Sequence, residues 1–122
     1  MTIQELYAKI GANYEQATRV MRMDKLIDRY IRKLSSSGVW EALQAAGQAM
    51  DPTKLFEAAH AMKGVCANLG LDELAQLAGE ITEEYRPGAT RTLTDDEVKA
   101  RLQKVDEVFA HVMAGIKEYE QQ

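Results

Sequence analysis

The 122-residue chain has one cysteine, two prolines and no long apolar run. A single cysteine cannot form a disulfide within the chain, and it is typical of proteins from a reducing compartment. No run of apolar residues approaches the roughly 20 that a membrane-spanning helix needs. The N-terminus lacks the basic and apolar regions of a secretory signal. These absences predict a cytoplasmic protein that does not enter a membrane.

The charge balance also excludes a class of partners. The chain has 15 Lys and Arg against 19 Asp and Glu, a net charge of −4. It therefore has no overall basic character that would favour nucleic acid binding. A chain of this length is large enough for one domain that buries a core without a disulfide or a metal. We therefore expect a single domain over residues 1–122, with no nucleic acid partner.

Helix signals dominate the sequence, and no segment alternates with period two for long enough to predict a strand. Helix start signals occur at residues 2–5, 51–52 and 94–97, as two capping boxes and one Asp-Pro pair. Short loops separate the amphipathic segments, which implies antiparallel neighbours. The predicted fold is all-α: an antiparallel up-down four-helix bundle over residues 24–121, with an extra N-terminal helical cap over residues 1–23.

One histidine faces away from the predicted core. On a helix over residues 52–70, with 100° per residue, an arc of about 80° contains Leu55, Ala59, Met62, Cys66 and Leu69. His60 lies about 140° from the centre of this arc and therefore projects outward. Its neighbours on the outer face are small or apolar apart from one lysine, namely Phe56, Lys63, Gly64, Ala67 and Leu71. An exposed imidazole with such neighbours is typical of chemistry presented to a protein partner.

The residues around His60 are suited to carrying an anion. An imidazole is nucleophilic at neutral pH and can accept a phosphoryl group on a ring nitrogen. Lys63, three residues on, is close enough to stabilise that group. Gly64 costs about 1 kcal/mol relative to alanine in mid-helix, which suggests that a partner approaches the backbone there. Glu57, three residues before His60, is a candidate to bind the other ring nitrogen and fix the tautomer.

The pattern resembles that of the histidine-containing phosphotransfer (HPt) domain over roughly residues 26–112. The matching features are His60-x-x-Lys63-Gly64, Leu69-Gly70, Leu74 and Leu77. The resemblance implies a four-helix bundle whose exposed histidine takes a phosphoryl group from the aspartate of one receiver domain and passes it to another. It implies that His60 is the phosphorylated nucleophile, that Lys63 stabilises the phosphate and that Gly64 leaves room for the receiver. Phe56, Ala67 and Leu71 are then expected to form the apolar part of the docking surface.

The same resemblance sets expectations for cofactors and partners. The chain has no glycine-rich phosphate loop, so we expect a phosphoryl carrier without autokinase activity rather than an enzyme. No cofactor is expected in the chain itself, because Mg²⁺ would be supplied by the receiver domain. The expected partners are receiver domains of response regulators or hybrid histidine kinases. We expect the protein to be a monomer and a separate component of a two-component phosphorelay.

Two other functions remain open from the residues. The bundle could be an interaction module that binds receivers without carrying phosphate. Glu57 and His60 also form a Glu-x-x-His pair, as found in di-iron bundles, but the second histidine, His111, has no glutamate three residues before it. A Cys66–His60 nucleophilic pair is excluded because about 9 Å along the helix and 120° around it separate the two residues. We therefore expect no metal ligands, a buried Cys66 and a solvated His111.

Overall fold

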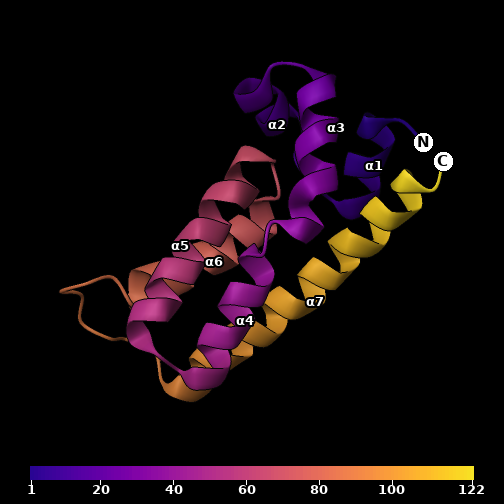
Figure 1. Cartoon of the computed structure of the whole chain (residues 1–122). Helices are drawn as coiled ribbons and strands as arrows, with labels where there is room; N and C mark the ends of the chain where they lie inside the picture. The colour runs from indigo at the N-terminus through magenta and orange to yellow at the C-terminus, as the bar shows by residue number, and fades with distance from the viewer.

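The computed structural model describes all 122 residues, and it contains only helices (Figure 1). In chain order these are α1 (Ile3–Ile10), α2 (Tyr14–Met21), α3 (Asp24–Lys33), the 3₁₀ turn η1 (Leu34–Ser36), α4 (Val39–Ala49), α5 (Pro52–Asn68), α6 (Asp72–Glu84) and α7 (Asp95–Glu120). The predicted all-α fold is confirmed. None of these helices combines the length and the apolarity that crossing a bilayer requires.

The last four helices form an antiparallel bundle (Figure 1). Each of α4, α5 and α6 packs against the next helix, and α4 also contacts α7, which closes the ring. The long helix α7 continues beyond the bundle, where it packs against α1 and α3. Helix α3 lies with α1 and α2 at this end, because the turn through Gly38, with a positive φ of 78°, separates it from α4. The boundary between cap and bundle thus lies near residue 38 rather than residue 23.

One continuous core runs through the bundle and the cap. The arc that the sequence places on the inner face of α5 is fully or almost fully buried, from Leu55 to Leu69. On α7, apolar residues from Val98 to Ile116 complete the core at the spacing of an amphipathic helix. The side chains of Ile3, Leu6 and Ile10 extend it into α1. The cap is therefore packed on the bundle as part of the same domain.

A buried carboxylate orders the loop between α6 and α7. Glu84 accepts hydrogen bonds from Arg91 Nε at 2.8 Å and from the backbone N–H groups of Thr92 and Leu93, each at 2.9 Å. Burial alone would raise the pKa of Glu84, but these hydrogen bonds lower it to about 2. Glu84 therefore stays charged at neutral pH and holds the loop against the end of α6.

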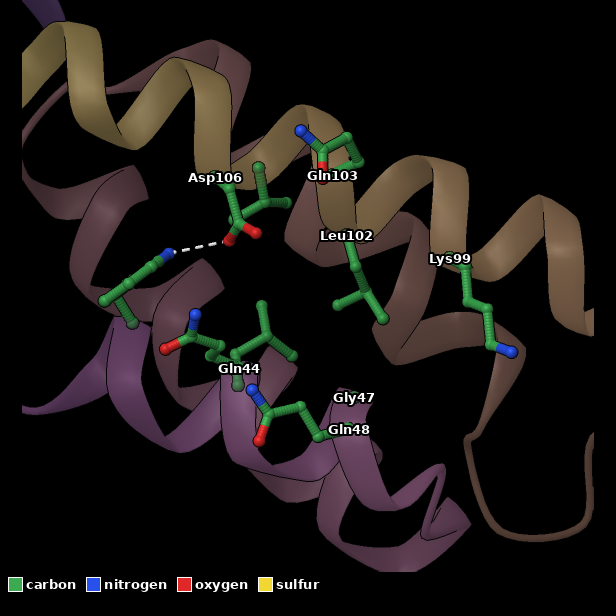
Figure 2. Close-up of a pocket in the computed structure, with 10 residues that line it drawn as sticks. Gln44, Gly47, Gln48, Lys99, Leu102, Gln103 and Asp106 are labelled. Atoms are coloured by element: carbon green, nitrogen blue, oxygen red, sulfur yellow. Dashed lines mark hydrogen bonds between the residues drawn. The ribbon is translucent and has the colours of Figure 1, made fainter.

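Helices α4 and α7 meet along a partly polar groove of about 280 Å³ (Figure 2). Trp40 Nε1 donates a hydrogen bond to Asp106 Oδ1 at 2.9 Å, and the indole stacks on Phe109. A Cβ added to Gly47 would lie 2.8 Å from Leu102 Cδ1, so the glycine allows close approach of the two helices. The glutamines that line the groove are Gln44, Gln48 and Gln103. The groove is thus a seam of helix packing.

Candidate functional site

The helix that carries His60 is fixed at both ends. Asp51 caps its start, and its side chain accepts hydrogen bonds from the N–H groups of Thr53 at 3.1 Å and Lys54 at 3.2 Å. Pro52 occupies the first turn, where its missing N–H is not needed. At the other end, Gly70 reverses the chain with a φ of +71°. His60 therefore lies near the middle of a well-anchored 17-residue helix.

The structure confirms that His60 is exposed. Its imidazole stacks on the ring of Phe56, with the ring centroids 5.7 Å apart and the planes 10° from parallel. Phe56 is half-buried, and the guanidinium carbon of Arg86 lies 5.5 Å from the centroid of its ring. Neither ring nitrogen of His60 has a hydrogen-bond partner in the protein. The imidazole is thus oriented by an apolar contact while both of its nitrogens remain free to react.

The expected contact between Glu57 and His60 is not formed. Glu57 is exposed and makes no hydrogen bond or ion pair. The geometry of the helix explains the difference, because Phe56 lies about 40° from His60 around the axis and Glu57 about 60° in the opposite direction. The imidazole of His60 also points back along the helix onto Phe56, as the side chain at i+4 does toward the residue at i. Phe56, and not Glu57, positions the ring.

Lys63 lies against the neighbouring helix α6. Its Cδ and Cε atoms are each 3.6 Å from the point where a Cβ on Gly79 would be, so its aliphatic stem crosses α6 at a residue without a side chain. Glu83, one turn further on, has a lowered pKa. Hydrogen bonds from Arg86 are the main cause, and the charges of Lys63 and His60 add to it. Lys63 and His60 therefore share one electrostatic environment.

An ion pair completes this environment. Arg86 Nε and Nη2 donate to the two carboxylate oxygens of Glu83 at 2.9 and 2.8 Å. The carboxylate of Glu83, whose pKa the charges of Lys63 and His60 help to lower, is thus already engaged by a cation. We define the His60 surface as Phe56, His60, Lys63 and Gly64 with Glu83 and Arg86.

Gly64 has open space beside it. The residue is exposed, and an added Cβ would meet no atom within 4 Å. No packing within the protein therefore requires a glycine, although glycine weakens the helix at this position. The surface beside His60 is consequently open at Gly64, and another molecule can come close to the backbone of α5 there.

The three residues expected to form the docking surface differ in their exposure to solvent. Phe56 and Ala67 are half-buried at the surface, but Leu71 is only 3% exposed. The expectation that Leu71 lies on the outer face is wrong, because it extends the periodicity of α5 past the end of that helix. Gly70 turns the chain at this point, and Leu71 then points into the core as the residue before α6.

Two residues near the site were missed in the sequence. They are Arg86 and Gly79, which belong to none of the motifs that the sequence displays. A glycine in the middle of a helix can be used as a signal in the sequence, since it often marks a position where another segment packs close to the helix backbone. Nothing in the sequence places Arg86 near Phe56, because this contact depends on how α5 and α6 pack.

The structure also gives the surroundings of the other candidate residues, Cys66, His111 and the Glu57–His60 pair. Cys66 is fully buried, and burial raises the pKa of its thiol to about 12, so it is not a nucleophile at neutral pH. His111 is exposed on α7. No group of three or more His, Cys, Asp or Glu side chains is arranged to hold a metal ion. Glu57 and His60 both face solvent, whereas a di-iron site needs inward-facing ligands.

The family model of the Hpt domain matches residues 22–111, which include α3 to α6 and most of α7. The chain belongs to the Hpt domain family. Hpt domains are phosphotransfer modules of two-component signalling that interact with receiver domains, and they carry phosphoryl groups rather than act as enzymes. Searches of curated proteins and of solved structures found no match to this Hpt chain. Helices α1 and α2 lie outside the matched residues.

Proposed function

We propose that this Hpt protein is a phosphorelay intermediate that carries the phosphoryl group on His60. The observation that supports this most directly is an exposed imidazole with two unpaired ring nitrogens, beside Lys63 and Gly64, within the family-matched residues. The donor is the aspartyl phosphate of one receiver domain, and the acceptor is the aspartate of another. Such receivers belong to response regulators or hybrid histidine kinases. The protein acts in the cytoplasm as a monomer.

The transfer is an in-line displacement at phosphorus. The lone pair of one ring nitrogen of His60 forms the N–P bond while the P–O bond to the receiver aspartate breaks. The electron pair of that bond returns to the aspartate carboxylate, and the other ring nitrogen keeps its proton. The second receiver reverses these bond changes with its own aspartate. The ammonium group of Lys63 offsets the negative charge that the phosphoryl group brings to His60.

We expect the metal ion for this reaction to come from the receiver domain. Mg²⁺ prefers carboxylates and phosphate oxygens, but Glu83 at the His60 surface is bound by Arg86. The metal required to neutralise the transferred phosphoryl group would therefore be held by carboxylates of the receiver. The role of this chain is to present a fixed, accessible nucleophile and a nearby positive charge.

The direct test is to mix the protein with an isolated receiver domain that has been charged with acetyl phosphate. We expect phosphate to move to this chain and to be labile in acid and stable in base, as a phosphoramidate bond is. Incubation with ATP alone serves as the control and should leave the chain unlabelled. Labelling that survives acid, or no labelling from any receiver of the source organism, would contradict the proposal.

Gly64→Ala should separate stability from transfer. Because the added methyl group meets nothing within 4 Å, the helix should gain stability by about 1 kcal/mol. Transfer from a charged receiver should nevertheless become several-fold slower, since the methyl group occupies space that the receiver needs. Chemical denaturation measures the first effect and transfer kinetics the second. Labelling by the small donor phosphoramidate should be unchanged, and equal transfer by variant and parent would show that no partner approaches Gly64.

A further inference from the structure

The large apolar side chains that are exposed in this protein all lie in the cap. They are Val20, Met23 and Tyr30, which are 42%, 53% and 44% exposed. Val20 lies on α2 and Tyr30 on α3, and both line an open groove of about 650 Å³ between these helices and the end of α5. Met23 lies in the short link between α2 and α3. The α2–α3 segment therefore leaves an apolar area in contact with water.

The same segment is the basic part of an acidic protein. Residues 19–33 contain six Lys and Arg against two Asp, a net charge of +4, whereas the rest of the chain has nine Lys and Arg against 17 Asp and Glu, a net charge of −8. Five of the seven arginines of the chain form ion pairs, and the two that form none are Arg22 and Arg29. Much of the positive charge of this segment is thus not neutralised within the protein.

Three cations without an ion pair form a stripe along the outer face of α3. The inner face contains Ile27 and Ile31, which are fully buried. At 100° per residue, Arg29 lies opposite the mean direction of these two residues, and Lys25 and Lys33 lie about 40° to either side of it. All three cations are exposed and line an open depression of about 470 Å³. The stripe therefore faces directly away from the core.

The arrangement of charge and apolar surface favours a lipid over a protein partner. The core of a protein interface is depleted in charged residues, lysine among them. On α3 the cations occupy the outermost stripe, and Tyr30 lies at its edge, about 60° around the helix from Lys33. A layer of anionic headgroups accepts such a stripe without a matching shape, and tyrosine is enriched where headgroups meet acyl chains. A basic amphipathic helix of this kind is typical of proteins that lie on a membrane surface.

We propose that the outer face of α3, together with Met23 and Tyr30, binds the surface of an anionic phospholipid membrane. Lys25, Arg29 and Lys33 lie among the headgroups, and the two apolar side chains reach the boundary with the acyl chains. Such a surface lies on the bilayer and needs no spanning helix. It shares no residue with the His60 surface, so the inference does not depend on phosphotransfer. A carrier held in this way meets membrane-bound partners at a raised local concentration.

The test is flotation of the full chain with vesicles of phosphatidylcholine alone and of an equal mixture with phosphatidylglycerol. We expect the parent to bind only the mixed vesicles and to be released at high salt concentration. The triple variant Lys25→Gln, Arg29→Gln, Lys33→Gln should bind about a hundredfold more weakly, since each basic residue strengthens binding to an anionic surface about fivefold.

The matched control is Lys54→Gln, Lys99→Gln, Lys104→Gln, which removes the same charge from exposed lysines of the bundle and should bind nearly as the parent does. The double variant Met23→Ser, Tyr30→Ser should bind about tenfold more weakly than the parent without a change in salt dependence. Phosphoramidate should label all these proteins equally, and circular dichroism should show the same helix content.

Three results would overturn the inference while leaving phosphotransfer at His60 intact. The first is that the parent does not bind the mixed vesicles. The second is equal binding by the triple variant and its matched control, which would show that the position of the cations on α3 has no importance. The third is retention of the parent by immobilised polyglutamate without binding to the mixed vesicles, which would identify an acidic protein as the partner.

Discussion

Replacing His60 with glutamine should reduce phosphoryl transfer from a charged receiver by about a thousandfold or more, to the background level. Glutamine keeps much of the length and polarity of histidine, but its amide nitrogen has no available lone pair for attack on phosphorus. The fold should be unaffected, since His60 is exposed and its one aromatic contact is with Phe56. The measurement is transfer of labelled phosphate from the receiver, followed on the time scale of the parent reaction.

The second histidine provides the matched control. His111 is also exposed on a helix, but it lies on α7 and outside the His60 surface, so His111→Gln should transfer at the rate of the parent. A His60→Gln variant that still binds receivers but does not relay phosphate would support the carrier function. If it relays as well as the parent, the carrier function is wrong. The protein would then be an interaction module that binds receivers without accepting phosphate.

Much of the fold follows from local rules that the sequence displays. The capping boxes at Thr2 and Thr94 and the Asp51-Pro52 pair mark starts of helices in the structure. The period of the apolar residues on α5 gives its buried side, and with it the exposure of His60. These features depend on interactions within a few residues, so the sequence alone is enough to predict them.

The predictions from the sequence that were wrong concern places where the chain changes direction or where the directions of side chains decide a contact. Leu71 was assigned to the outer face because a helical period was continued beyond Gly70, where the helix has ended. Glu57 was assigned a contact with His60 from spacing alone, whereas the direction of the side chains favours Phe56. The groove between α2, α3 and the end of α5 could not be predicted at all, because residues that line it, such as Val20 and Val65, are 45 residues apart and are brought together only by packing.

The attachment of the cap to the end of α5 predicts a second large effect. Gly70 has a φ of +71°, and a Cβ there would lie 2.1 Å from the backbone oxygen of Asn13. The N–H of Asn13 in turn donates to the carbonyl oxygen of Gly70 at 2.8 Å, so neither segment can move away without breaking this bond. The hydroxyl of Tyr7 donates to the carbonyl oxygen of Leu69 at 2.6 Å, which ties α1 to the same turn.

Gly70→Ala should therefore lower the free energy of unfolding by about 3–5 kcal/mol, the sum of left-handed backbone strain and a clash with rigid backbone. Gly11→Ala is the matched control, because Gly11 has a similar φ of +68° but open space around it. It should lose only about 1 kcal/mol. Urea unfolding followed by circular dichroism measures both, and losses that differ by less than 1 kcal/mol would contradict the packing argument. Since the strain lies ten residues from His60, the folded fraction of Gly70→Ala should still be labelled by phosphoramidate at the rate of the parent.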